Sequence, residues 1–171
     1  DGIANNHLNY DYINPANPPT DWISEMVQIY LKNRTTRAVE RITVDSGGHI
    51  AKCGSSFNPT ISTDGRYVAF SSTAPRFFGL DDSNCFYRRV ENRHNEQIVL
   101  RDRTAGTTRI ISMDASGKLL RGPCKHPHIS ADNTQVLFDC QSKALEGETD
   151  PTFGPYFFIK DLATGELKRV I

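Results

Sequence analysis

Two histidines come closest to the spacing of a metal site. His126 and His128 lie two residues apart on an expected strand, so both imidazoles would point to one face. Cys124 is close by, but no further ligand is evident nearby in the sequence, and a zinc site needs three or four. We therefore expect ordinary polar strand residues here, with no metal and no cofactor.

Two acidic segments offer the oxygen ligands that Ca²⁺ prefers. They run from Asp81 to Asn84 and from Glu146 to Asp150. Neither has the spacing or the closing Glu of an EF-hand loop, so solvated acidic loops are the better interpretation.

Catalytic motifs are missing from the sequence. It contains no nucleophile elbow, no His-Glu-x-x-His helix, no phosphate-binding glycine-rich loop and no Cys-x-x-Cys-His haem attachment. We therefore expect a protein that is not an enzyme.

One short motif indicates a covalent modification. Asn33-Arg34-Thr35 is an N-glycosylation sequon, and it falls in an expected hairpin turn where the side chain is exposed. Asn33 is therefore a candidate glycosylation site, although such tripeptides often arise by chance.

The longest irregular segment, Thr73 to Glu96, carries aromatic side chains that could bind a glycan or a peptide. These candidate contact residues are Phe77, Phe78, Phe86 and Tyr87. The alternative is that these rings form a small local core beside Cys85.

Two kinds of repeated hairpin must position these residues. The first runs from Asn58 to Ser72 and recurs from His126 to Cys140, with turns at Asp64-Gly65 and Asp132-Asn133. The second begins at 29–37, 99–107 and 158–166, each with an apolar strand, a turn and a second strand. The two kinds alternate along the chain, which predicts an all-β fold.

Composition excludes several classes of protein. The chain has 171 residues, and its 20 Lys and Arg balance 20 Asp and Glu, so no overall field favours a nucleic-acid partner. Apolar runs are too short for a membrane span. The first residue is Asp1, which suits a processed mature chain or an excised fragment. Residues 1–21, rich in Asn, Asp and Pro, read as an extended arm.

The four cysteines lie far apart, with no Cys-x-x-Cys pair. They are Cys53, Cys85, Cys124 and Cys140. An even number allows two disulfides in three connectivities, and four reduced thiols are the alternative.

The order of hairpins resembles the blades of TolB-like, WD-repeat-like β-propellers. The resemblance rests on Ile61 to Ser72 and on Val99 to Arg109, and it covers residues 28–171. Arg37 stands where the pattern has a turn glycine, and Asn133 replaces the glycine after Asp132. The resemblance implies antiparallel four-stranded blades in an incomplete propeller over 22–171. Its parts would be an outer hairpin at 27–44 and blades at 58–113 and 126–171.

About two and a half blades cannot close a ring, because propellers need four to eight. The expected open edge of the first hairpin, at Val27, Ile29 and Leu31, is a template for another strand. Tyr10, Tyr12 and Ile13 give the arm apolar surface for such a contact. The arm could fold back on its own chain, neighbouring copies could supply strands, or the chain could belong to a longer propeller.

Propeller topology places all four cysteines on one face. The resemblance therefore implies disulfides between Cys53 and Cys85 and between Cys124 and Cys140, and an extracellular or periplasmic location. The expected function is a structural protein that self-associates as a ring or filament by strand complementation. A glycan- or peptide-binding module is the alternative.

Overall fold

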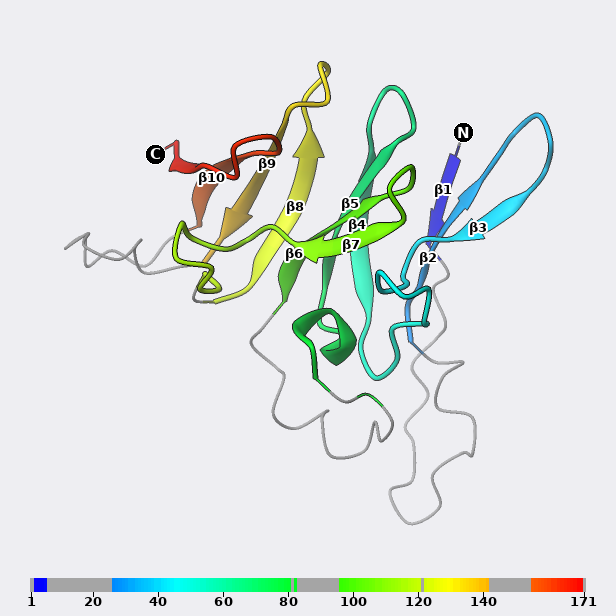
Figure 1. Cartoon of the computed structure of the whole chain (residues 1–171), viewed down its shortest axis with the longest axis horizontal. Coiled ribbons are helices and arrows are strands. Elements are labelled where there is room, and N and C mark those ends of the chain that lie inside the picture. The colour runs from blue at the N-terminus through cyan, green and yellow to red at the C-terminus, as the bar shows by residue number, and fades with distance from the viewer. Residues whose placement is uncertain are drawn as a thin grey trace, which may run out of the picture.

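The computed structural model describes residues 2–5, 26–80, 82, 96–120, 122–141 and 155–170. Those residues form three antiparallel sheets that stand side by side (Figure 1). Sheet A contains β1 (Gly2–Asn5), β2 (Ile29–Lys32) and β3 (Val39–Arg41), in that order. The expectation of an all-β fold with four-stranded antiparallel sheets is confirmed by the other two sheets.

Sheets B and C each contain four strands in chain order. Sheet B is formed by β4 (Ser56–Ile61), β5 (Tyr67–Ser72), β6 (Gln97–Asp102) and β7 (Thr107–Ile110). Sheet C is formed by β8 (Cys124–Ile129), β9 (Gln135–Cys140), β10 (Tyr156–Asp161) and β11 (Leu167–Arg169). A short 3₁₀ helix, η2 (Pro75–Phe78), follows β5. This strand order is that of a propeller blade.

The first strand of sheets B and C carries the same irregularity. A β-bulge shifts the register of β4 between Phe57 and Thr60, and another shifts β8 between Lys125 and His128. Asn58 and His126 both have a φ of 50° within these bulges. The two sheets are therefore structural copies down to a local backbone distortion.

Alternating side chains build two cores between the sheets. Ile29, Leu31 and Ile42 of sheet A pack with a cluster that includes Val68 and Phe70 of sheet B. The opposite face of sheet B packs on sheet C through a second buried cluster, which includes Ala69, Ile98, Leu100, Ile111, Val136, Phe138 and Phe158. Sheet B is thus covered on both faces.

The N-terminal strand changes the expected picture of the first hairpin. β1 pairs antiparallel with β2, with Asn5 opposite Ile29 and Gly2 opposite Lys32. The edge is therefore paired within the chain at residues 29–32, where we expected a template for another strand, and Val27, Ile29 and Leu31 are buried. Residues 2–5 of the arm pair with their own chain, as one of the alternatives held, because strand pairing gives hydrogen-bond partners to backbone groups that an open edge leaves without them. Tyr10, Tyr12 and Ile13 lie outside the described residues.

No helix in the described ranges is long and apolar enough to cross a membrane.

Candidate functional site

The three sheets repeat the same contacts, so each residue can be compared with its equivalents. Ser112 Oγ donates to Gln97 Oε1 at 2.7 Å, and Thr43 Oγ1 donates to Gln28 Oε1 at the same place in sheet A. One main-chain hydrogen bond recurs in all three sheets, from Ile42 N to Ile29 O, from Ile111 N to Ile98 O and from Val170 N to Phe157 O. These bonds fix which residues are equivalent.

At each junction a basic side chain donates to a main-chain carbonyl in the segment that follows the preceding sheet. Arg101 Nη1 donates to Asp45 O at 3.3 Å, and the equivalent Lys160 Nζ donates to Met113 O at 3.0 Å. Lys160 is buried, and this desolvation, with the nearby positive charge of Arg109, lowers the pKa of its ammonium group. The junction between sheets thus has a fixed polar contact as well as an apolar core.

The outer face of sheet C, which points away from sheet B, exposes large apolar side chains. Phe157 is 49% exposed, Val170 43% and Leu137 37%. Their equivalents in sheet B are Ile98, Ile111 and Ala69, which are at most 1% exposed because sheet C covers them. The outer face of sheet C therefore resembles the surface of a junction between sheets, and within the described residues no further sheet packs on it.

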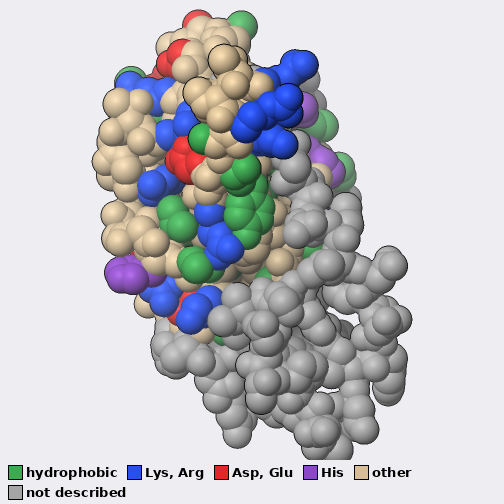
Figure 2. Space-filling view, turned by 90° about the vertical axis from the view of Figure 1, so that its right-hand side faces the viewer, with side chains coloured by type: hydrophobic (Ala, Val, Ile, Leu, Met, Phe, Trp, Pro, Cys, Tyr) green, Lys and Arg blue, Asp and Glu red, His purple; other side chains and the backbone are tan. Residues whose placement is uncertain are grey.

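The outer face of sheet A, which points away from sheet B, mixes hydrophobic and basic side chains. Tyr30 lies opposite Arg41 and Lys32 opposite Val39, so these four side chains share the face. The Arg41 guanidinium lies 5.1 Å above the Tyr30 ring and donates to its hydroxyl at 2.6 Å. Figure 2, which views this end of the molecule, shows Lys and Arg side chains beside hydrophobic ones.

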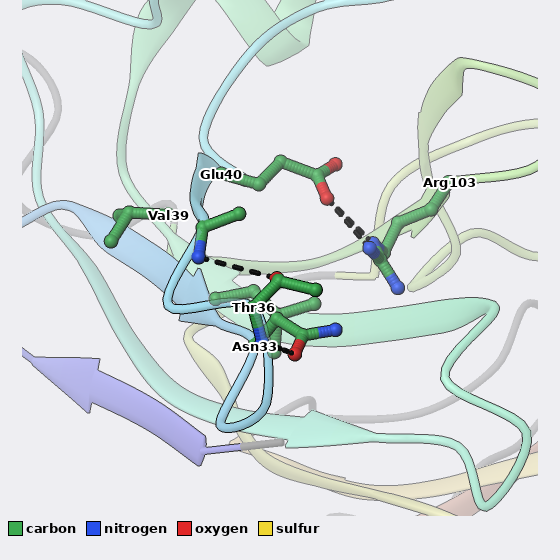
Figure 3. Close-up of a pocket in the computed structure, with 7 residues that line it drawn as sticks. Asn33, Thr36, Val39, Glu40 and Arg103 are labelled. Atoms are coloured by element: carbon green, nitrogen blue, oxygen red, sulfur yellow. Dashed lines mark hydrogen bonds and ion pairs between the residues drawn. The ribbon is translucent and has the colours of Figure 1, made fainter.

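A pocket of about 170 Å³ lies between the β2–β3 hairpin and sheet B. Glu40 and Arg103 form an ion pair across it, with Arg103 Nη2 donating to Glu40 Oε2 at 2.7 Å (Figure 3). Asn33 Oδ1 accepts hydrogen bonds from the backbone of Thr35 and Thr36. The volume is below the 300 to 1,000 Å³ typical of small-molecule sites. Its polar groups already pair with each other, so the pocket is best explained as a notch between a hairpin and its neighbouring sheet.

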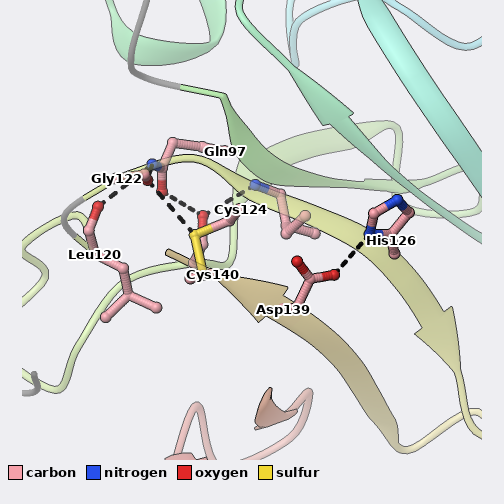
Figure 4. Close-up of a disulfide and its surroundings, with 9 residues drawn as sticks. Gln97, Leu120, Gly122, Cys124, His126, Asp139 and Cys140 are labelled. Atoms are coloured by element: carbon pink, nitrogen blue, oxygen red, sulfur yellow. Dashed lines mark hydrogen bonds and ion pairs between the residues drawn. A yellow bond between two sulfur atoms is a disulfide. The ribbon is translucent and has the colours of Figure 1, made fainter. Parts of the chain in front are cut away.

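One disulfide joins the first two strands of sheet C. Cys124 and Cys140 lie opposite each other on β8 and β9 and are bonded, which is the pairing that the propeller resemblance implies. Beside it, Gln97 Nε2 donates to Leu120 O and Gly122 O (Figure 4). Gly122 has a φ of 90°, and a Cβ there would lie 2.4 Å from Gln141 O. The backbone segments beside the disulfide are therefore closely packed.

Cys53 is also disulfide-bonded. Its expected partner, Cys85, lies outside the described residues.

The two histidines do not form a metal centre with Cys124, because that cysteine is in the disulfide. His126 Nδ1 instead lies 2.7 Å from Asp139 Oδ1, while His128 is exposed. Within the described residues, no three His, Cys, Asp or Glu side chains are grouped to hold a metal ion.

The acidic loop at 81–84 is described only at Asp82, whose carboxylate has a structural role. Asp82 is 2% exposed, and it accepts hydrogen bonds from Lys52 N at 2.9 Å and from Arg76 Nε at 2.8 Å. These bonds connect the loop before β4 to η2. The second acidic segment, 146–150, lies outside the described residues.

The aromatic pair on η2 packs inward. Phe77 makes an edge-to-face contact with the buried Phe70, at 5.7 Å between ring centroids, and Phe78 is half-buried against the same core. Both rings thus add to the core between sheets A and B, while Cys85, beside which the sequence offered a local core, lies outside the described residues. Phe86 and Tyr87 lie outside the described residues.

The sequence analysis did not predict the two surfaces described above, which are the outer faces of sheets A and C. A signal was present, because Leu137 and Phe157 align with Ala69 and Ile98 once the hairpins are superposed. The direction of each face, however, follows only from the stacking of the sheets.

No family model matches the chain, and no curated protein matches it. Solved structures similar in fold include the following two. TolB from Acinetobacter baumannii is 16% identical with a TM-score of 0.47, and the match covers 85% of this chain and 27% of that one. The tricorn protease is 12% identical with a TM-score of 0.49, and the match covers 84% of this chain and 11% of that one. The chain thus spans less than a third of either protein, and at this similarity neither match carries an argument about function.

Proposed function

We propose that this chain is a non-catalytic structural module that self-associates by completing its open stack of sheets. One observation carries the proposal. The outer face of sheet C exposes apolar side chains, and their equivalents in sheet B are buried against sheet C. Burying each such side chain stabilises a contact by about 1.5 to 3 kcal/mol, so an uncovered face of this kind favours association.

Sheet A offers a second reason for association, which is strand complementation. It contains three strands where sheets B and C contain four, and β1 occupies the second position. In the described part of the chain, no strand fills the innermost position beside β1. A strand from a neighbour could pair there through main-chain N–H and C=O groups.

An extracytoplasmic location completes the proposal. The Cys124–Cys140 bond and the bonded Cys53 would persist in an oxidising compartment, whereas cytosolic thiols are normally kept reduced. We infer a secreted or periplasmic protein.

A glycan- or peptide-binding role finds no specific support. The pocket at the β2–β3 hairpin is small, and Phe77 is used in packing. We therefore propose no second function.

The direct test is the mass of the untagged 171-residue chain by light scattering after gel filtration, over a hundredfold range of concentration. We expect a mass above the 19.2 kDa of one chain. Deleting residues 1–20 removes β1 and should weaken the association. A single-chain mass at every concentration would reject the proposal.

A further inference from the structure

We propose that the outer face of sheet C binds the outer face of sheet A of a second copy, and that two copies close head to tail into a ring of six sheets. The inference rests on the proposed self-association, and it names the two surfaces, the partner and the copy number.

The first argument comes from the outer face of sheet C. Phe157, Val170 and Leu137 hold the positions of Ile98, Ile111 and Ala69, which sheet C covers within the chain. Ile98, Ile111 and Ala69 are covered by the face of a blade. We therefore expect the face of another blade to fit over Phe157, Val170 and Leu137.

The second argument comes from the face that sheet C turns towards sheet B. At four positions it carries an aromatic ring, a lysine, an aliphatic side chain and an arginine, which are Phe158, Lys160, Leu167 and Arg169. The equivalent positions on the outer face of sheet A carry the same kinds of side chain, namely Tyr30, Lys32, Val39 and Arg41. The outer face of sheet A therefore carries the same kinds of side chain as the face of sheet C that packs on sheet B.

One further likeness involves the two arginines. The Arg41 guanidinium lies above Tyr30, the residue opposite it, and the Arg169 guanidinium lies 5.0 Å above the Tyr156 ring, two residues before Phe158, the residue opposite it. Each arginine is thus held flat against its own sheet, which leaves the apolar part of the face free to pack.

The number of copies follows from the number of sheets. The described residues of each chain form three sheets, so two copies give six, within the four to eight blades of closed propellers, whereas three copies give nine. In the closed pair, each copy uses its sheet C face once and its sheet A face once. Both outer faces are then buried, and no face is left to continue a filament.

The test uses one variant on each face and one matched control. Phe157→Glu alters the sheet C face, and Val39→Glu alters the sheet A face, where Val39 is 61% exposed and points away from Glu40 and Arg103 (Figure 3). Leu80→Glu is the control, because Leu80 is 42% exposed and follows η2, away from both faces. All three positions are exposed, so circular dichroism and the thermal midpoint should show unchanged folding.

We expect a wild-type mass of twice 19.2 kDa, a dimer dissociation constant raised about 100-fold or more in either face variant, and no change in Leu80→Glu. Mixing the two face variants should restore part of the dimer, because one of the two junctions then has unaltered faces on both sides. A dimer that survives both face variants would overturn this inference and keep the proposed self-association. A single-chain mass for the wild type would overturn both.

Discussion

Ser56 and Ser72 face each other across β4 and β5 at the positions that Cys124 and Cys140 occupy across β8 and β9. Ser56 Oγ donates to Ser72 Oγ at 2.9 Å, and both hydroxyls are buried. The first two strands of each sheet are thus linked at equivalent positions, by a hydrogen bond in sheet B and by a covalent bond in sheet C.

This equivalence predicts that a disulfide can be built into sheet B. In the double variant Ser56→Cys and Ser72→Cys, a bond should form, because Ser56 and Ser72 are paired across β4 and β5 as Cys124 and Cys140 are across β8 and β9, and both pairs are 16 residues apart. For a closed loop of that length, the free energy of unfolding should rise by about 3 kcal/mol. Urea denaturation with and without reductant measures the gain, and Ser56→Cys alone is the control. A variant with two free thiols at these positions would contradict the equivalence.

The converse exchange replaces the disulfide of sheet C by a serine pair like that of sheet B. Replacing Cys124 and Cys140 by serine should lower the free energy of unfolding by about 2 to 4 kcal/mol through loss of the cross-link. Replacing both by alanine should cost about 1 kcal/mol more, because the alanine pair cannot form the serine hydrogen bond. Thermal and urea denaturation of the two variants compare them directly. Equal stability would show that serine forms no such bond in sheet C.

Arg37 should be a site where glycine stabilises the protein. Its φ is 64°, and the equivalent turn positions hold Gly106 and Gly165, with φ of 69° and 73°. A side chain in this left-handed region costs about 1 to 2 kcal/mol, part of which the greater freedom of unfolded glycine offsets. Arg37→Gly should therefore raise the free energy of unfolding by about 0.5 to 1 kcal/mol. Gly106→Ala should lower it, and an opposite sign in either variant would refute the explanation.

Stability should fall in acid because turn carboxylates have lowered pKa values. A hydrogen bond from the Arg66 guanidinium lowers the pKa of Asp102, and hydroxyl bonds from Ser62 and Ser130 lower the pKa of Asp64 and Asp132. The folded state then holds fewer protons than the unfolded state, so this stabilisation is complete above the unfolded pKa of about 3.9. It is lost as the pH falls from there through the folded values.

Urea midpoints at pH 7, 5, 4 and 3 measure this loss. At pH 7 the urea midpoint of Arg66→Gln should lie below that of wild type, because the ion pair with Asp102 is lost, and this deficit should shrink at pH 3 as the carboxylate becomes protonated. A deficit that is the same at every pH would show that Arg66 does not act through Asp102.

The sequence by itself determined the local structure of this protein. Short β-prone apolar runs, Tyr67 to Phe70 and Ile98 to Leu100, specified β5 and β6, and Asp64-Gly65 and Gly106 marked their turns, because strand propensity and turn chemistry depend on near neighbours. The repeated hairpins also carried enough pattern to predict four-stranded blades.

Tertiary structure decided the features on which function depends. The pairing of β1 with Ile29 joins residues far apart in the chain, and no local pattern predicts it. The same holds for Leu137 and Phe157, whose exposure differs from that of Ala69 and Ile98 although all four lie on strands of equivalent blades. Whether such side chains are covered depends on which sheet packs against them, and that is a property of the stack and not of the strand.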